Sequence, residues 1–336
     1  MAVRDQVITD NYAIYNGDSC EVLKSMPSAS IDFSVFSPPF ADLYCYSDNP
    51  ADLGNCRTYD EFFQHFGFII HELARVIKPG RLCAVHCIDI PAMKERDGYI
   101  GLKDFPGDIV RAFQAAGMIY HSRHVIWKDP LIEATRTKAL GLMHKQLCKD
   151  STACRSGLPD YLLAFRVPGE NASPVVHPDG LTRYCGRTDP GGEGIKKSHN
   201  IWRAYASPVW MDIRQTHTLD ARKARDSDDE KHLCPLQLDT IERACVLWSN
   251  PGEVVLTPFM GVGSEVYGAV LNGRRGIGIE LKPSYYRQAV KNLAACKPSA
   301  EDGDLFEKPN TAVCGPKPSA GLGTQNELVG PSESGE

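Results

Sequence analysis

Two stretches at opposite ends of the chain each have the pattern of a strand, a helix and a second strand. The first has a β-branched and aromatic run at 31–36, a segment of helical periodicity at 59–77 and another apolar run at 81–87. The second has a short apolar run at 253–257, a glycine-rich turn, a helical segment and the run 275–281. Because parallel strands need a helical crossover, both stretches predict βαβ units of a nucleotide-binding α/β sheet.

The residues between these units first continue the alternation of strands and helices, and then lose any regular pattern. The interval 168–232 is dense in Gly, Pro, His and charged residues and predicts an irregular insertion. The other predicted elements are helices at 104–117, 235–249 and 283–295 and strands at 119–128 and 160–167.

Composition limits the class of protein. The 336 residues, 42% hydrophobic and 24% charged, suffice for one large α/β domain with an insertion or for two ordinary domains. No basic leader and no apolar run near eighteen residues is present, so we expect a cytoplasmic protein without a membrane segment. None of the twelve cysteines has C-x-x-C spacing, and the closest pair, Cys83 and Cys87, lies in a strand-like run. Reduced, mostly buried thiols and no metal are therefore expected.

The net charge of −5 is unevenly distributed. Residues 297–336 carry seven acidic and three basic side chains, are rich in Gly, Pro, Ser and Glu, and are predicted to be disordered. Residues 121–166 and 183–223 each carry eight Lys or Arg against four Asp or Glu. These two segments are either an ordinary solvated surface or a phosphate-binding face.

The glycine-rich turn "PFMGVGS" is the first motif with chemical meaning. Gly261 and Gly263 lie between a strand and a helix, where absent side chains let a ligand approach the backbone and the helix N-terminus. Glu280 ends the next strand about twenty residues on, where a carboxylate binds ribose hydroxyls in such folds. The alternative is glycine for tight packing and Glu280 as a surface cap. Glu265 follows Ser264 with no third glycine in place, which disfavours a dinucleotide.

The run "SPPF" directly after the strand 31–36 is the second motif. Two prolines fix the turn and remove two N–H donors, so the Pro38 carbonyl and the Ser37 hydroxyl are available to accept hydrogen bonds from one amino group. Phe40 offers a flat face for stacking. The alternative places Phe40 in the core.

Together these motifs resemble the amino-DNA methyltransferases that use S-adenosylmethionine, in the class whose catalytic motif precedes its cofactor motif. The matching segments are "NGDSCEVL" (16–23), "SPPF" (37–40), "HLCPLQL" (232–238), "TPFMGVGSEV" (257–266) and "GIGIEL" (276–281). The resemblance implies a Rossmann-like sheet with circularly permuted motif order and an inserted target-recognition region.

The resemblance also assigns site residues. The implied catalytic residues are Ser37, Pro38, Pro39 and Phe40. The implied cofactor-binding residues are Asp18, Pro235, Thr257, Pro258, Phe259, Gly261, Gly263, Ser264 and Glu280. Thr257 stands where the family has Asp, and Cys234-Pro235 shifts the family's helix-opening proline.

The implied reaction is methyl transfer to an exocyclic amino group of a base rotated out of double-stranded DNA and stacked on Phe40. Ser at the first motif position is more common in cytosine-N4 enzymes, which favours that target over adenine-N6. A non-catalytic DNA-binding relative is a further alternative, motivated by Thr257. Ring-carbon methylation is disfavoured because no cysteine follows a proline, and glutamine methylation because the motif order is reversed.

The pattern of strands and helices and the family resemblance together divide the chain into six segments. It consists of a catalytic half (1–127), a basic insertion (128–159), a sheet strand (160–167), a target-recognition insertion (168–231), a cofactor-binding half (232–296) and an acidic tail (297–336). A bacterial or phage-encoded modification enzyme of the restriction-modification type is expected, with a homodimer left open.

Overall fold

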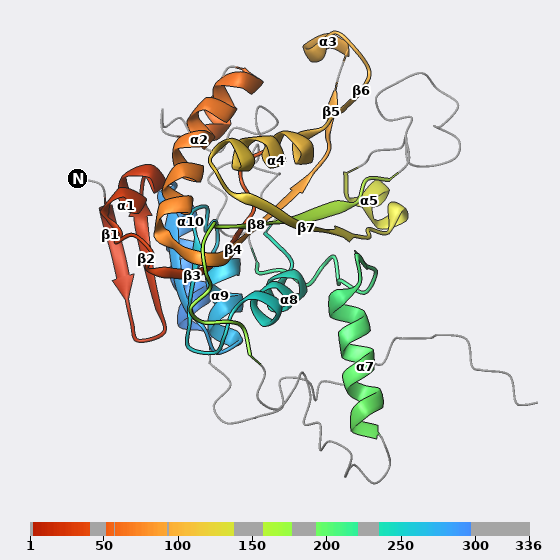
Figure 1. Cartoon of the computed structure of the whole chain (residues 1–336). Coiled ribbons are helices and arrows are strands. Elements are labelled where there is room, and N and C mark those ends of the chain that lie inside the picture. The colour runs from red at the N-terminus through yellow and green to blue at the C-terminus, as the bar shows by residue number, and fades with distance from the viewer. Residues whose placement is uncertain are drawn as a thin grey trace, which may run out of the picture. The chain divides into compact units, whose positions relative to one another are not determined.

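A nine-stranded sheet runs through the part of the chain that the structure describes (Figure 1). The computed structural model describes residues 3–40, 52–56, 58–92, 94–137, 157–176, 193–220 and 235–296, all within one compact unit, 1–302. The strand order is β1-β2-β11-β10-β3-β4-β8-β7-β9. The strands are β1 (Val3–Ile8), β2 (Tyr12–Gly17), β3 (Ile31–Phe36), β4 (Ile77–Ile88), β7 (Ile119–Ile126), β8 (Asp160–Arg166), β9 (Val209–Trp210), β10 (Val254–Thr257) and β11 (Arg275–Glu280).

The central strands β2, β11, β10, β3 and β4 are parallel, and β8 pairs antiparallel with both β4 and β7. The chain order reverses between β10 and β3, which come from the two βαβ units. Ligands of open α/β sheets bind at such a reversal, outside the carboxyl ends of the strands. The fold therefore directs attention to the residues that follow β3, β10 and β11.

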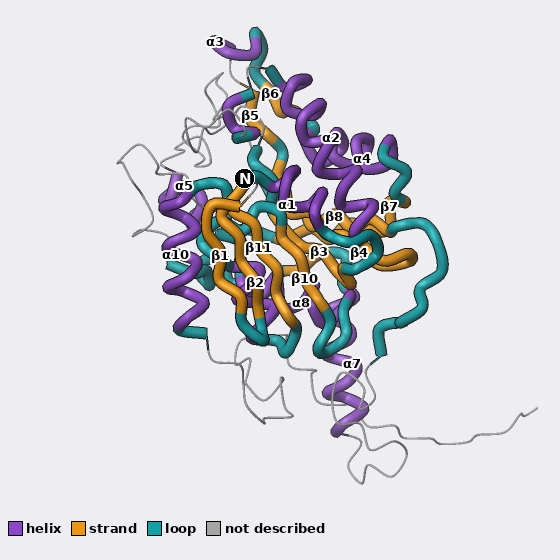
Figure 2. The backbone as a smooth tube through the Cα atoms, turned by 90° about the vertical axis from the view of Figure 1, so that its left-hand side faces the viewer, coloured by secondary structure: helices purple, strands orange, loops and turns teal. Residues whose placement is uncertain are grey.

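Helices cover both faces of the sheet (Figure 2). Helices α1, α2 and α4 pack on one face, and α8, α9 and α10 on the other. The helices are α1 (Ser19–Ser25), α2 (Tyr59–Val76), α3 (Lys94–Asp97), α4 (Phe105–Ala115), α5 (Pro130–Thr137), α7 (Glu193–Ala206), α8 (Leu238–Trp248), α9 (Ser264–Leu271) and α10 (Pro283–Ala294), with a 3₁₀ turn η2 (Leu53–Asn55) and a small hairpin of β5 (Ile90–Ala92) and β6 (Gly101–Lys103). Within the described ranges, every helix is too short or too polar to cross a membrane.

Local sequence explains where the long helix α2 begins and which face it buries. The Thr58 hydroxyl accepts a hydrogen bond from the Glu61 N–H at 3.1 Å, which caps the first turn. Phe62, Phe66 and Ile70 recur at helical spacing and are fully buried against the sheet. Burial of each such side chain contributes roughly 1.5–3 kcal/mol. The βαβ prediction for 31–87 is confirmed by the parallel pairing of β3 with β4.

Two buried side chains join the N-terminal and C-terminal units. The Asp32 carboxylate accepts a hydrogen bond from the Val254 N–H at 2.9 Å and pairs with Lys78 at 2.5 Å. The Arg81 guanidinium donates to the Asp32 carbonyl and pairs with Glu253. These contacts fix the register of β3 against β10, and hence the relative positions of the two motifs.

The fold differs from the sequence-based expectation in two places. The hairpin of β1 and β2 was not predicted, although β2 pairs parallel with β11 and brings Asp18 to the same edge as Glu280. The interval 168–232 is not irregular throughout, because α7 and β9 lie inside it and β9 extends the sheet. The glycines at 191, 192 and 194 obscured the helical periodicity of α7 in the sequence. Residues 177–192, 221–234 and 297–336 lie outside the described part, so the predicted disorder of the tail stays a prediction.

Candidate active site

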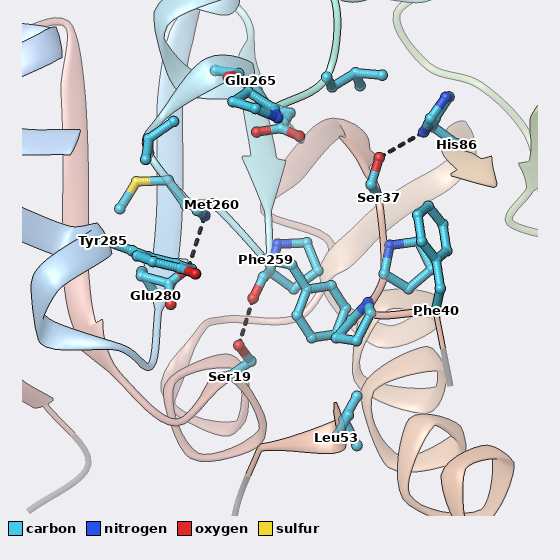
Figure 3. A pocket seen from close by; sticks show the side chains of 18 of the residues that line it. Ser19, Ser37, Phe40, Leu53, His86, Phe259, Met260, Glu265, Glu280 and Tyr285 are labelled. Carbon is cyan, nitrogen blue, oxygen red and sulfur yellow. Dashed lines mark hydrogen bonds between the residues drawn. The ribbon is translucent and has the colours of Figure 1, made fainter. Parts of the chain in front are cut away.

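A cavity of about 490 Å³ opens at the carboxyl ends of the parallel strands (Figure 3). Most of the residues predicted from the motifs line it: Asp18, Ser37, Pro38, Pro39, Phe40, Pro235, Pro258, Phe259, Gly261, Ser264 and Glu280. In Figure 3, Ser37 and His86 lie on one side of the pocket, and Glu280 and Tyr285 on the other. We call these the Ser37 end and the Glu280 end.

Glu280 is held in place by two backbone donors. Its carboxylate accepts hydrogen bonds from the Gly261 N–H and the Lys282 N–H, both at 2.8 Å. Gly261 adopts φ +55°, a left-handed conformation that glycine reaches without strain. Burial raises the pKa of Glu280 to about 7, against the lowering effect of the two N–H groups. Hydroxyl groups of a ligand would favour the charged form.

Gly263 and Thr257 support the wall of the cavity from behind. Gly263 caps α9 at φ +94°, and a Cβ there would lie 3.2 Å from the Cβ of Ala289 on α10. It is therefore required for conformation and helix packing, whereas only Gly261 of the pair lines the cavity. Thr257 is 1% exposed, and its hydroxyl has no hydrogen-bond partner among the described residues.

Asp18 and Pro258 connect α1 to the glycine-rich turn. The Asp18 carboxylate caps α1 by accepting from the Glu21 N–H at 3.0 Å. The Ser19 hydroxyl donates to the Pro258 carbonyl at 2.5 Å, as Figure 3 shows. The Phe259 ring lies 5.6 Å from Phe36 and packs into the core. This end of the cavity is thus rigidly built before any ligand binds.

Three buried polar groups near the start of α8 and α9 lack partners. The side-chain carbonyl of Gln237 and the hydroxyl of Ser264 have no hydrogen-bond partner in the described ranges. The Glu265 carboxyl is 4% exposed and has only its own backbone N–H. All three residues line the cavity. Buried polar groups without partners are rare in folded proteins, and at a cavity wall they indicate a polar ligand.

At the Ser37 end, side chains of four strands meet in a connected chain of contacts. The Ser37 hydroxyl lies 2.8 Å from His86 Nδ1, and His86 Nε2 lies 3.1 Å from the Asp160 carboxylate, outside hydrogen-bond alignment. Lys128 pairs with Asp160 at 2.9 Å and contacts Glu133 at 3.5 Å. Because β8 is antiparallel, its first residue, Asp160, lies at the edge where β4 and β7 end.

The charge of Asp160 decides the direction of the hydrogen bond between Ser37 and His86. Burial raises the pKa of Asp160, but His86 and Lys128 outweigh it and lower that pKa to about 2. Asp160 is therefore an anion that only accepts, and its negative charge beside His86 Nε2 favours the tautomer with the proton on that nitrogen. Nδ1 is then the acceptor for the Ser37 hydroxyl, whose oxygen lone pairs remain available to the cavity.

Phe40 is shared between core and cavity. Its ring packs edge-on against Phe105 of α4 at 6.1 Å, and it is half-buried. It also lines the cavity together with Pro38 and Pro39. The two interpretations of Phe40, core residue and stacking surface, are therefore compatible.

The basic segments are only partly described. Lys128 pairs inside the cavity with Asp160, which corrects its assignment to a phosphate-binding surface. Lys196 and Arg203 of α7 are exposed. The side chain of Arg136 and residues Lys138, Lys145, Lys149 and Arg155 lie outside the described set, so this face stays a prediction.

Sequence analysis missed several residues of the cavity wall. His86 and Asp160 lie in two strands and Lys128 lies just after a third, so the three residues form no local motif. Glu265 was noticed only as a departure from dinucleotide spacing. A polar residue inside an apolar strand run, as His86 is in "RLCAVHC", was the available signal.

Known proteins resemble the chain in both sequence and structure. A family model described as DNA methylase matches residues 173–291. The type II methyltransferase M.BglI of Bacillus subtilis is 24% identical over 318 residues, which cover 84% of this chain and 85% of the relative.

Two solved structures share the fold. A protein of Thermus thermophilus described as a DNA modification methylase, in complex with S-adenosyl-L-methionine, has a TM-score of 0.59 at 22% identity, covering 86% of this chain and 97% of its own. The PvuII DNA methyltransferase, described as cytosine-N4-specific, has a TM-score of 0.54 at 16% identity, covering 87% and 90%.

The sheet and its reversal between β10 and β3 give the chain the Rossmann-like fold of these two solved structures. This confirms the predicted fold class. The family model and the type II methyltransferase relative support the resemblance to amino-DNA methyltransferases that the motifs indicated.

Proposed function

We propose that this protein transfers a methyl group from S-adenosylmethionine to an exocyclic amino group of a base in double-stranded DNA, with cytosine N4 as the target. One observation carries the proposal: the Ser37 hydroxyl and the Glu280 carboxylate line the same cavity. A base amine and a methyl donor can therefore meet there.

The cavity fits S-adenosylmethionine by its chemistry. Glu280 supplies an acceptor for ribose hydroxyls, and Gly261 allows close approach of the backbone. The unpartnered Gln237 and Ser264 side chains suit the polar amino-acid end. When bound, the cofactor supplies an electrophilic methyl group on a sulfonium.

The Ser37 end supplies a path for the proton that the amine must lose. The exocyclic nitrogen is a weak nucleophile because its lone pair is delocalised into the ring, and accepting its N–H bond on Ser37 Oγ restores electron density. When the amine is methylated, with S-adenosylhomocysteine as the leaving group, the proton that the nitrogen loses would pass to Ser37 Oγ. The Ser37 proton passes to His86 Nδ1 in the same step. The resulting imidazolium is paired with the Asp160 carboxylate.

The residue type at the first motif position, a serine, supports cytosine N4 as the target base. Ser37 is neutral and its oxygen accepts one N–H bond while its own proton goes to His86. Adenine N6 carries the same amino chemistry and is the other candidate.

Transfer of labelled methyl groups to duplex DNA, followed by nucleoside analysis, tests the proposal. We expect N4-methylcytosine from the wild type, and no transfer from Ser37→Ala combined with Phe40→Ala, with S-adenosylhomocysteine binding retained. Ser25→Ala is the matched control, because that serine also donates a hydrogen bond but lies on α1 outside the cavity. N6-methyladenine would reassign the base, and full activity of the double variant would refute the proposal.

A further inference from the structure

Six carboxyl groups line the cavity, and five of them already have partners from other residues. The five are Asp18, Asp52, Glu133, Asp160 and Glu280, which accept backbone N–H groups or pair with Lys128. Glu265 is the exception in the described part of the chain, since it has only its own backbone N–H. A carboxyl group that is 4% exposed needs a strong reason to remain unpaired.

The position of Glu265 indicates which kind of ligand group pairs with its carboxyl. It lies in the first turn of α9, directly after Ser264 and close to the Gln237 end of α8. Neither helix has a side-chain cap, and the side-chain carbonyl of Gln237 and the hydroxyl of Ser264, which can donate, have no partner among the described residues. Donors for a carboxylate and an acceptor for a cation together match a zwitterionic amino-acid group.

The residue at position 257 also indicates that an anion is needed elsewhere in the cavity. The family places a carboxylate there for the methionine part of the cofactor, whereas this chain has a neutral side chain that does not line the cavity. The cofactor's α-ammonium group therefore needs another anion. This step rests on the proposed function.

We propose that Glu265 binds the α-ammonium group of S-adenosylmethionine, in place of an acid at position 257. Burial, together with the nearby charge of Glu280, raises the pKa of Glu265 to about 8. The free protein therefore holds this carboxyl mostly protonated at pH 7. Binding of an ammonium group favours the charged form, so ligand binding releases a proton from Glu265.

Calorimetry with two nucleosides tests the inference. S-Adenosylhomocysteine carries the ammonium group, and 5′-methylthioadenosine lacks the whole amino-acid end. We expect Glu265→Gln to weaken S-adenosylhomocysteine binding by about 10-fold or more and to change methylthioadenosine binding by less than about 2-fold. Titration in buffers of different ionisation enthalpy should show that this variant releases about one proton fewer at pH 7.

Glu242→Gln is the matched control, because Glu242 is also a mostly buried carboxyl of raised pKa but does not line the cavity. It should change neither ligand's affinity. Equal weakening of both nucleosides by Glu265→Gln would overturn the inference, as would unchanged binding of S-adenosylhomocysteine by this variant. Failure of the wild type to bind any of these nucleosides would instead refute the proposed function.

Discussion

The two ends of the cavity treat their buried charges in opposite ways. At the Ser37 end, Asp160 lies between His86 and Lys128, and these two neighbours stabilise its anion. At the Glu280 end, Glu265 has no side-chain partner among the described residues. The difference is what our two proposals require: the Ser37 end is preorganised for chemistry, whereas the Glu280 end is completed by the bound cofactor.

Replacement of His86 should give the largest effect. His86→Asn keeps a polar side chain but removes the base that receives the Ser37 proton. We expect methyl transfer to fall by roughly 10²–10⁴-fold and its dependence on pH to change, while S-adenosylhomocysteine binding stays the same. Single-turnover transfer across pH values measures both. A variant with unchanged turnover would show that the contact with Ser37 is only structural.

The stability of the free protein should depend on pH through Glu265, at the Glu280 end of the cavity. The pKa of Glu265 is raised in the folded state, so its contribution to stability is present below about pH 4.5 and is lost as pH rises through about 8. The full change is on the order of 5 kcal/mol. Thermal unfolding from pH 5 to 8 should show a decline that Glu265→Gln makes smaller, and the remaining decline is due to Glu280, whose pKa is also raised, to about 7.

At the Ser37 end, Asp160 should change the stability with pH in the opposite direction. Its pKa is lowered to about 2, so its contribution is present above about pH 3.8 and is lost as pH falls toward 2. A decline between pH 5 and 8 that Glu265→Gln leaves intact would assign the effect to another group and would remove the contrast between the ends.

A smaller effect is expected from Glu280→Ala. The change removes the carboxylate that we assign to the ribose hydroxyls and frees the N–H groups of Gly261 and Lys282. Cofactor affinity should fall by roughly 1.5–3 kcal/mol, the range for a hydrogen bond to a charged group. With saturating cofactor, the pH profile of transfer should match the wild type. An altered profile would mean that the two ends are not independent.

The sequence predicted those parts of the site that are contiguous in the chain. Ser37 to Phe40 and the turn around Gly261 lie in short motifs whose residues share one local purpose. His86, Asp160 and Lys128 could not be predicted together, because their proximity depends on the antiparallel pairing of β8 with β4 and β7. The alternation of strands and helices predicted the central sheet, but the polar residues of "VRDQVI" concealed the edge strand β1.

The pairing of β3 with β10 has a consequence for synthesis on the ribosome. Asp32 and Val254, which bond across these strands, are 222 positions apart. Closing a loop of this length is entropically costly and slow compared with local pairing. Until β10 has been translated, β3 presents an unpaired backbone edge that other chains can join. The growing polypeptide therefore has no catalytic cavity, and the cell needs to protect this edge until the last sheet strands emerge.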